Sequence, residues 1–514
     1  MADITQSNEA TQAPPGPRSN PAWDQLVARF EDLRNFGSAI ALLRWDQEVM
    51  MPPEGNAARA SSMATLEAVF HSRLTDPSLG DLLDELGSDD SLDQDQAASV
   101  RVLRREHDKA VRVPEDLVRE LATTRGVAYQ RWVEARAADD FSLFEPHLKH
   151  IVELKKQEAD AIGWEDERYD ALLDDYEPGV TTKEVEAIFS ELVAGLTPLV
   201  ERVVDAADAR PEWLSQPFDE ALQQSFCASL AESLGFNVVG GRLDQSPHPF
   251  TMTVGPGDVR QTIKTEPNSL LPSIYAAMHE TGHALYEQGI PKEMINLPIG
   301  QVPSLGMHES QSRLWENLVG RSRAYTDFLL PRIKERFPQV GMVSPEDFYR
   351  AVNWPQRSLI RIHADELTYN LHIALRLELE LALFRDELEV SDLPGAWNDA
   401  MQRHLGVRPD SDANGVLQDV HWSSALHGYF STYTLGNLYA AALFNKATED
   451  HLGDLEGDMR KGDVSRLLEW LRTHVHSQGY RYPASELAQR VLGEPLSSAP
   501  LLKYLTAKYE ALFA

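Results

Sequence analysis

The sequence predicts a large, mainly α-helical protein with one small β element. Its 514 residues are 42% hydrophobic and 25% charged, which is typical of a globular chain that is long enough to bury a sizeable core. Apolar residues recur every three or four positions along much of the chain, which is the helical period. Convincing alternation of apolar and polar residues occurs in one stretch, so we expect a single two-lobed helical domain with a small sheet.

The N-terminal part of the chain is expected to change from a tail to helix at Pro21. Residues 1–20 are polar and proline-rich, so we predict a disordered tail there and one domain over residues 21–514. After Pro21, large apolar residues follow the helical period. They are Trp23, Leu26, Val27, Phe30, Leu33 and Phe36, and then Ile40, Leu42, Leu43 and Trp45.

Charge changes sign between residues 76 and 112. The acidic stretch 76–96 contains Gly and Ser and predicts a link between helices. The basic run 101–112 is open to two interpretations, a patch for acidic partners or the solvated face of a helix. Glu106 and Asp108 interrupt the run, so we favour the helix face.

Further helices are predicted in the middle and C-terminal parts. Thr181 and Glu184 form a capping box after the turn residues Pro178 and Gly179, which predicts that a helix starts here and that helix continues to about residue 230. The helical period returns over residues 352–384 and 464–479, and we predict helix throughout both.

The β element is predicted at residues 248–265. Apolar and polar residues alternate on both sides of Gly255-Pro256-Gly257, a pattern typical of a hairpin. Because this stretch directly precedes the helix described next, it can form an edge beside that helix. Such an edge can bind an extended peptide by strand addition.

Residues 268–289 predict one helix that carries an H-E-x-x-H motif. Asn268 or Ser269 can cap its start, Pro272 suits its first turn and Gly289 suits the position after its end. The motif lies in the middle of this helix, among largely apolar neighbours where unpaired imidazoles would be costly.

His279 and His283 are four residues apart and therefore lie on one face of the helix, where both can bind one metal ion. Glu280 points aside, which suits a general base acting on water. The alternative, two surface histidines on an ordinary helix, is the weaker interpretation. For a third ligand, Glu287 is a poor candidate because it lies about 12 Å along the axis from His279.

Glu309 is a better third ligand. It lies at the start of a second predicted helix, residues 306–325, and follows His283 by 26 residues, which is enough chain to turn and return. Spacing alone leaves an equal alternative, a first-turn carboxylate paired with Arg313 at i+4.

Composition excludes several classes of partner. The formal net charge is −32, which argues against nucleic acid or an anionic membrane as a partner of the general surface. No stretch has the length or apolar character of a membrane span or a signal peptide. Cys227 is the single cysteine, so no intrachain disulfide can form, and we predict a cytoplasmic protein.

Six spaced motifs complete the picture. They are His248-Pro249-Phe250; Asp258, Arg260 and Thr262; His279, Glu280 and His283; His308-Glu309-Ser310-Gln311; Ile360, Arg361, Ala364 and Asp365; and Gly415, Gln418, Asp419, His421 and Trp422, followed by Tyr429 and Tyr433. Together they resemble the carboxypeptidase Taq family of metallocarboxypeptidases over nearly the whole chain after the tail. One departure is Ser431, where the family usually has proline.

This resemblance implies a helical gluzincin fold with a deep active-site groove. It implies a homodimer that releases single C-terminal residues from peptides with broad specificity. It also makes Glu309 the third ligand of a Zn²⁺ ion, which Co²⁺ or Mn²⁺ can replace.

The resemblance also implies catalytic roles. Glu280 would take the proton of the activated water and pass it to the leaving amine. Tyr429, Tyr433 or His421 would donate a hydrogen bond to the oxyanion, with ordinary packing as the alternative for both tyrosines. Asp419 would orient His421.

An exopeptidase must also bind a free C-terminal carboxylate, for which arginine is well suited. Arg260 and Arg361 are the candidates, and the alternative for each is an ion pair, with Asp258 and with Asp365 respectively. The remaining predicted substrate-binding residues are His248, for which a packed structural role is as plausible, Asp258, Thr262 and Asp419.

Two other functions stay open on sequence alone. A related helical peptidase with the same metal ligands would cut internal bonds as an oligopeptidase. A non-enzymatic peptide-binding scaffold would keep the site without turnover, although the intact Glu280 argues against it.

Overall fold

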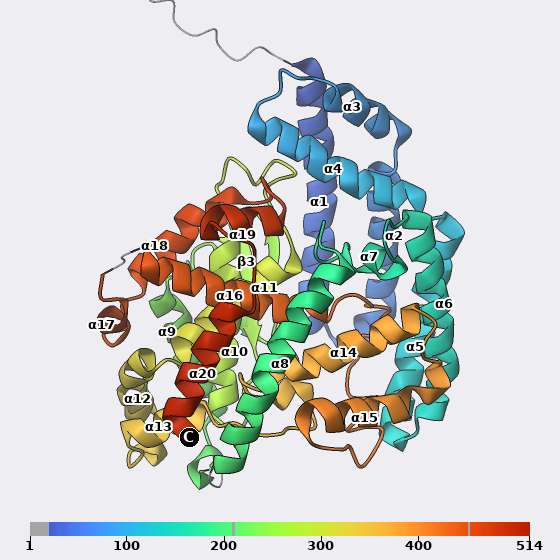
Figure 1. Cartoon of the computed structure of the whole chain (residues 1–514). Helices are drawn as coiled ribbons and strands as arrows, with labels where there is room; N and C mark the ends of the chain where they lie inside the picture. The colour runs from blue at the N-terminus through green and yellow to red at the C-terminus, as the bar shows by residue number, and fades with distance from the viewer. Residues whose placement is uncertain (1–19, 208–210, 451–452, 514) are drawn as a thin grey trace, which may run out of the picture.

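The computed structural model describes residues 20–207, 211–450 and 453–513 (Figure 1). The tail predicted over residues 1–20 lies outside these residues except for Asn20. Within them the fold is mainly α-helical with one three-stranded sheet, as predicted. Among the helices described, none has the length and apolar character that crossing a membrane requires.

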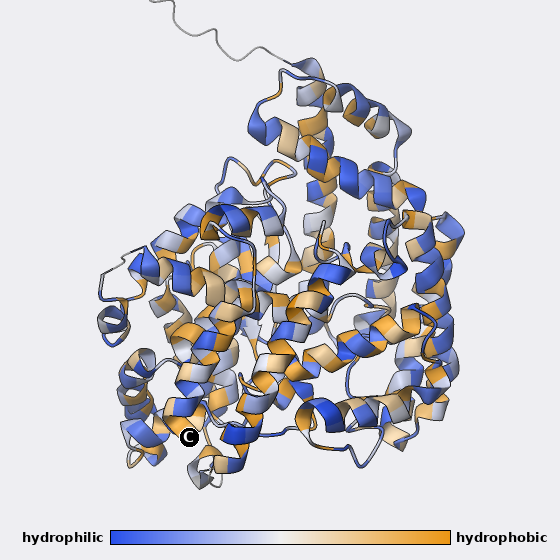
Figure 2. Ribbon diagram, viewed as in Figure 1, coloured by the Kyte–Doolittle hydropathy of each residue, from blue (hydrophilic) through white to orange (hydrophobic). Residues whose placement is uncertain are grey.

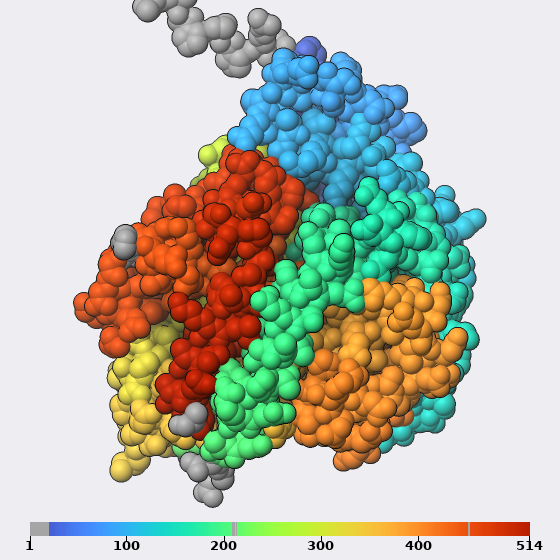
Figure 3. All heavy atoms as spheres, viewed as in Figure 1, coloured from blue at the N-terminus to red at the C-terminus, as the bar shows by residue number. Residues whose placement is uncertain are grey.

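Four helices make the N-terminal lobe, whose upper part stands above the body in Figures 1 and 3. They are α1 (Pro21–Val49), α2 (Asn56–Leu74), α3 (Pro77–Gly87) and α4 (Gln94–Arg112). The lobe has a hydrophobic core of its own, built from α1, α3 and α4. The far end of α1 packs against strand β2 of the body, so the lobe and the sheet are in direct contact.

The link predicted over residues 76–96 is wrong, because most of it is helix α3. Asp76 caps this helix through a hydrogen bond from the Ser78 amide. Leu79, Leu82 and Leu83 then form a buried stripe, so the apolar spacing outweighs the acidic composition. The run 101–112 lies in α4, as favoured above, but its charged residues are only partly solvated. Arg101, Glu106 and Arg112 are exposed, whereas Arg105 and Lys109 are partly buried and pair with Asp174.

The body contains the remaining helices around one large core. Those before the sheet are α5 (Glu115–Ala138), α6 (Glu145–Ile162), α7 (Arg168–Leu173), α8 (Thr182–Ala206) and α9 (Glu220–Leu234). The capping box of Thr181 and Glu184 is present at the start of α8. In Figure 2 most helices show hydrophobic and hydrophilic residues in turn, as expected for helices with one buried side.

The helices after the sheet include the two that carry the HExxH motif and Glu309. They are α10 (Leu271–Glu287), α11 (Leu305–Arg313), α12 (Arg323–Arg336), α13 (Pro345–Val352), α14 (Tyr369–Phe384), α15 (Leu393–Leu405), α16 (Ser431–Glu449), α17 (Leu455–Met459), α18 (Ser465–His474), α19 (Ala484–Leu492) and α20 (Ala499–Phe513). A π-helix, η4 (Leu314–Gly320), continues α11. The helix predicted over residues 306–325 is thus three elements.

Two local predictions are wrong for identifiable reasons. Neither Asn268 nor Ser269 caps α10, whose N-cap position is Leu270 and has no side-chain hydrogen bond. The helix predicted over residues 352–384 covers only α14 in its second half. Before α14 the chain is largely irregular, because Pro355 disfavours helix at the preceding residue and Asp365 binds the Gln356 amide.

The sheet has the strand order β1-β3-β2. The predicted hairpin is present as antiparallel strands β2 (Thr251–Gly255) and β3 (Asp258–Ile263). Strand β1 (Gly241–Gln245) pairs parallel with β3 and was not predicted, because its sequence lacks apolar alternation. Helix α10 packs against β2 and β3, which places the HExxH motif beside the hairpin.

Two glycines allow α11 to approach its neighbours closely. A Cβ on Gly282 of α10 would lie 2.6 Å from the Gln311 carbonyl oxygen of α11. A Cβ on Gly436 of α16 would lie 2.6 Å from Cγ of Glu309. Helix α11 is therefore held between α10 and α16 at a distance that only glycine permits at these points.

We predict that Gly282→Ala destabilises the protein by about 1–3 kcal/mol, because its methyl group would meet backbone atoms that cannot move aside. The midpoint of thermal unfolding measures this. Gly126→Ala is the matched control, since a Cβ at this exposed position of α5 meets nothing within 4 Å and should stabilise by about 0.5–1 kcal/mol. Equal effects of the two substitutions would contradict the close helix contact.

Glu177 anchors the start of α11 and gives a pH prediction. Its Oε1 accepts a hydrogen bond from the Gly306 amide, its Oε2 has no partner among the described residues, and burial raises its pKa to about 8. Between about pH 4.3 and 8 the folded state holds a proton that the unfolded state has lost, so stability falls as the pH rises. The thermal midpoint of Glu177→Gln should therefore fall less between pH 5 and 8 than that of the parent.

The exposed Glu165 supplies the control for that experiment. Glu165→Gln should follow the parent at every pH. Parallel curves for the Glu177→Gln variant and the parent would show that Glu177 is ionised in the folded protein at pH 5.

Candidate metal centre and active site

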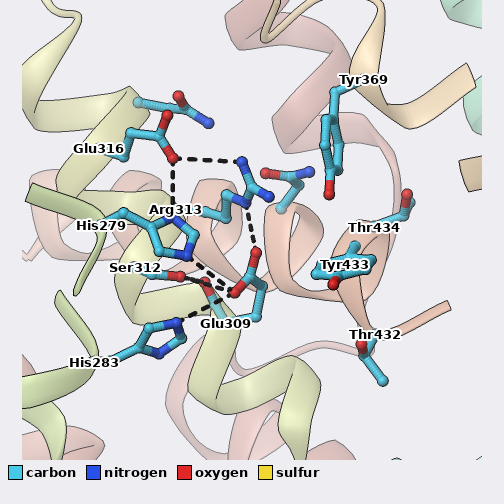
Figure 4. A network of polar contacts seen from close by, with 12 residues as sticks. His279, His283, Glu309, Ser312, Arg313, Glu316, Tyr369, Thr432, Tyr433 and Thr434 are labelled. Carbon is cyan, nitrogen blue, oxygen red and sulfur yellow. Dashed lines mark hydrogen bonds and ion pairs between the residues drawn. The ribbon is translucent and has the colours of Figure 1, made fainter. Parts of the chain in front are cut away.

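Three metal-ligating side chains meet where α10 packs against α11. His279 and His283 lie one turn apart on α10, and Glu309 lies early in α11. Glu309 Oε2 is 3.6 Å from His279 Nε2 and 3.4 Å from His283 Nε2 (Figure 4). One ligand atom of each residue lies within 4.8 Å of the others. The structure thus brings together the three residues predicted as ligands.

The spacing of these atoms fits a tetrahedral ion. Ligand atoms about 2.0–2.1 Å from a zinc ion at tetrahedral angles are about 3.3 Å from one another, close to the two separations above. Two imidazole nitrogens and one carboxylate oxygen are also a donor set of catalytic zinc sites, which leave a fourth position for water. By distance and chemistry, the residues fit a divalent metal.

Glu309 satisfies both interpretations that its spacing left open. Its Oε2 faces the two histidines, while its Oε1 accepts a hydrogen bond of 2.6 Å from Arg313 Nε, the i+4 partner. Ser312 Oγ donates to Oε2 at 3.0 Å. Burial alone would raise the pKa of Glu309, but Arg313 and the histidines bring it well below its usual value, so this carboxylate is ionised.

Glu316, which the sequence analysis missed, contacts the candidate ligand His279. Its Oε2 lies 2.9 Å from His279 Nδ1, so a proton on Nδ1 leaves Nε2 of His279 as a lone-pair donor toward a metal. Burial opposes ionisation, but His279, Arg313 and Arg321 lower the pKa of Glu316 to about 2. Seven residues are about two turns of an α-helix, so the spacing from Glu309 is the sequence signal that could have indicated Glu316, although the structure continues α11 as the π-helix η4.

Glu280 is held beside the hairpin. Its Oε2 accepts a hydrogen bond of 2.7 Å from Thr251 Oγ1 of β2, and the same hydroxyl oxygen lies 2.9 Å from the Glu280 carbonyl oxygen. Burial raises the pKa of Glu280, and a more basic carboxylate suits a group that takes and returns a proton. The hairpin thus orients the residue predicted as the general base.

Glu287 does not join the three ligands, as the 12 Å estimate predicted. Its Oε1 lies 3.2 Å from His308 Nε2, and its Oε2 accepts a hydrogen bond of 2.9 Å from Thr253 of β2. The His308 ring lies 4.2 Å from that of His283. This second acid and histidine therefore line the same region without entering the ligand set.

Aromatic residues face the ligands from the other side. Figure 4 shows Tyr369 and Tyr433 across from Glu309 and Arg313. The Tyr433 ring lies 5.3 Å from that of Tyr429, and its hydroxyl lies 3.3 Å from His421 Nε2. Burial raises the pKa of Tyr429 to about 12, so its hydroxyl keeps the proton that a donor needs.

Asp419 does not orient His421, contrary to the prediction. Its two oxygens bind Arg361 and Arg376, at 2.9 and 2.6 Å. His421 Nδ1 is buried without a hydrogen-bond partner among the described residues, and burial lowers the pKa of His421 to about 3, so the ring is neutral.

Arg361 does not pair with Asp365, because the segment forms only a short 3-10 helix, Arg361–His363, and not the α-helix that would bring residues four apart onto one face. Its partners are Asp419 and the Tyr369 hydroxyl, at 3.1 Å from Nη1. Its guanidinium lies 5.1 Å from the Tyr433 ring. Arg376, fully buried, is a second arginine that the sequence analysis missed, since only the tertiary fold brings it to Asp419.

Arg260 forms the ion pair that was its alternative. Both of its contacts with Asp258 are short, 2.8 and 2.7 Å, and its guanidinium lies 4.3 Å from the ring of Trp45 on α1. Its charge is therefore matched one to one by Asp258, and it connects the sheet to the N-terminal lobe.

The remaining predicted substrate residues lie around the loop before β2. His248 is exposed, so it is free to contact a ligand. Thr262 is fully buried, and its hydroxyl lies 2.7 Å from Ser246 Oγ and accepts a hydrogen bond from the Phe250 amide. The prediction that Thr262 binds substrate directly is therefore wrong, because its hydroxyl holds this loop together instead.

Comparison with known proteins identifies the family. The model of the carboxypeptidase Taq (M32) metallopeptidases matches residues 25–509. Thermostable carboxypeptidase 1 of Thermus thermophilus is 44% identical over 96% of this chain and 99% of its own length. Carboxypeptidase 1 of Bacillus subtilis is 36% identical over 94% of this chain and 96% of its own length.

Solved structures agree with this assignment. The M32 carboxypeptidase from Deinococcus radiodurans superimposes with a TM-score of 0.94 at 40% sequence identity and covers 96% of this chain and 100% of its own. The resemblance inferred from the six motifs is therefore confirmed. The chain belongs to the carboxypeptidase Taq (M32) family of metallopeptidases and is a metallocarboxypeptidase.

Proposed function

We propose that this metallocarboxypeptidase releases single residues from the free C-termini of peptides, with broad side-chain specificity. Its metal ligands are His279, His283 and Glu309, and its native ion is Zn²⁺. The convergence of the three ligand atoms within 4.8 Å supports this set. A zinc ion held there supplies Lewis-acid activation of water and of the substrate carbonyl.

The protein's own groups divide the remaining chemistry. Glu280, with its raised pKa, takes a proton from the attacking water and gives it to the leaving amine. The Tyr429 and Tyr433 hydroxyls are the candidate hydrogen-bond donors to the oxyanion, since both stay protonated. His421, neutral and 3.3 Å from the Tyr433 hydroxyl, positions that donor.

The observation that carries the exopeptidase assignment is an excess of buried positive charge. Arg361 and Arg376 share one carboxylate, that of Asp419, and no second acid forms an ion pair with either among the described residues. His421 and His372 beside them are neutral, because burial lowers the pKa of both. An unbalanced buried charge is costly, so the cluster is suited to receive an anion such as a C-terminal carboxylate.

Arg361 is the residue of this cluster that we assign to the substrate. It lies beside the Tyr433 ring, and Tyr433 faces Glu309, whereas Arg376 is held deeper by Gln418 and Asp419. Arg260 is less suitable, since Asp258 already neutralises it. Asp419 then acts by orienting both arginines, and His248 and the edge strand β2 remain candidates for contacts with the rest of the peptide.

Three further properties are proposed from the sequence and the family. One large core includes residues between 128 and 513, and the N-terminal lobe, which has its own core, packs on strand β2 through α1; we propose that both belong to the single domain predicted over residues 21–514. Cys227 is buried and free, consistent with a reducing, cytoplasmic location. A homodimer and a deep substrate groove follow from the family resemblance alone.

The direct test is mass spectrometry of a peptide incubated with the zinc-loaded protein. With a free C-terminus, the parent should remove residues one at a time; with an amidated C-terminus, it should not. Glu280→Gln should bind zinc as the parent does and lose about 100- to 10,000-fold in kcat. Internal fragments would indicate an oligopeptidase instead, and binding without cleavage would indicate a scaffold.

The two arginines can be told apart by substitution. Arg361→Met should lower kcat/KM on free C-terminal peptides by about 100-fold or more, because a buried charge pair with the substrate is lost. Arg260→Met should lower kcat/KM less than about tenfold while lowering the thermal midpoint, since its contacts are with Asp258 and Trp45. A larger loss of kcat/KM in Arg260→Met than in Arg361→Met would show that Arg260 binds the substrate carboxylate instead.

A further inference from the structure

We propose that Arg313 is the positioning residue of the metal centre. Its guanidinium donates a hydrogen bond to Oε1 of Glu309, which leaves Oε2 of Glu309 to bind the metal. The same guanidinium contacts Glu316, the carboxylate that orients His279. The inference rests on the ligand set proposed above. It concerns a residue that contacts the ligand Glu309 but neither of the two ligand histidines.

The contacts of Arg313 are specific to its two acids. Nε donates to Glu309 Oε1 at 2.6 Å, and Nη1 lies 3.4 Å from Glu316 Oε2. The guanidinium also lies 4.4 Å from the ring of Tyr369. With 14% of its side chain exposed, it has little freedom to leave this position. Figure 4 shows it between the two carboxylates, on the side of Glu309 away from His283.

The effect on Glu309 follows from its two oxygens. A free carboxylate can offer either oxygen, or both, to an ion. Here Oε1 is occupied by a charge-assisted hydrogen bond, which is stronger than one between neutral groups. Oε2 is the oxygen that faces both Nε2 atoms. Arg313 therefore selects which oxygen of Glu309 is presented and fixes its direction.

The effect on His279 passes through Glu316. Glu316 Oε2 is shared between His279 Nδ1 and Arg313, and its Oε1 lies 3.1 Å from Arg321 Nη2. Arg321 is in turn fixed over the Tyr275 ring at 3.8 Å. The carboxylate that orients the first histidine is thus held at both oxygens by guanidinium groups.

The backbone explains why these four charges align. Glu309 and Arg313 are four residues apart in α11, where this spacing lies on one face. Glu316 and Arg321 are five residues apart, a spacing that the π-helix η4 brings close through its i to i+5 repeat. The change from α- to π-helix therefore places four charged residues in one row beside the metal centre. Carboxylates and guanidinium groups alternate in this row, which is Glu309, Arg313, Glu316 and Arg321.

A structural role alone would predict lower stability without a change at the metal, so the test measures the metal directly. The parent, Arg313→Met and Arg313→Lys are compared as full-length proteins. The readouts are the Zn²⁺ dissociation constant from competition with a chelator, the visible absorption spectrum of the Co²⁺ form, and the thermal midpoint of the metal-free form. Arg385→Met is the matched control, since Arg385 also joins two glutamates, Glu167 and Glu186, at an exposed site.

We expect Arg313→Met to raise the Zn²⁺ dissociation constant about 10- to 100-fold and to change the Co²⁺ spectrum. Arg313→Lys, which keeps the charge but not the fork, should give an intermediate constant, and Arg385→Met the parent value. The proposal would be overturned if Arg313→Met kept the Zn²⁺ dissociation constant and the Co²⁺ spectrum of the parent. If Arg313→Met does not fold, the same result for Arg313→Lys would overturn it.

The outcome separates this proposal from the function. A parent that binds Zn²⁺ but releases no amino acids would contradict the carboxypeptidase mechanism while leaving the role of Arg313 intact. A parent that binds no Zn²⁺ would overturn the ligand set and this inference with it.

Discussion

The shared carboxylate of Glu309 is the constraint on which the rest of the site depends. One oxygen faces two histidines on α10, and the other binds an arginine on its own helix. This requires α11 to lie close to α10 and to α16, and Gly282 and Gly436 provide the space. Glu177 fixes the start of the same helix. The contacts that position α11 therefore also position the side chain of Glu309.

Two buried charge clusters lie on either side of the tyrosines and differ in balance. Around the metal ligands, Glu309 and Glu316 alternate with Arg313 and Arg321. Glu280 and Glu287 add two further acids, so the acids outnumber the guanidinium groups, which suits a cation. Around Asp419, two guanidinium groups face one acid, so the cluster has a positive charge to offer an anion. Tyr369 contacts an arginine of each cluster, Arg313 and Arg361. Under the proposed function, the scissile carbonyl of a peptide would lie at the first cluster and its C-terminal carboxylate at the second.

Local sequence determined most of what could be predicted. The HExxH spacing, the capping box at Thr181 and the hairpin depend on residues within a few positions of one another, and the structure contains all three. Helix α3 was missed because its acidic composition hid a leucine stripe. The partners of Asp419 were missed for a different reason, since Arg361 and Arg376 are 58 and 43 residues away and only the tertiary fold brings them together. Single-residue roles were therefore least accessible where they depend on distant charges.

The most direct measurement is a crystal structure of the zinc-loaded protein with anomalous diffraction at the zinc edge. We expect one strong peak, bound by Nε2 of His279, Nε2 of His283 and Oε2 of Glu309, with Arg313 on Oε1. This expectation would be contradicted by an ion that lies away from these atoms, or by Glu309 turned so that Oε1 binds the ion and Arg313 has lost its contact. Either result would show that the carboxylate is not divided as the present geometry indicates.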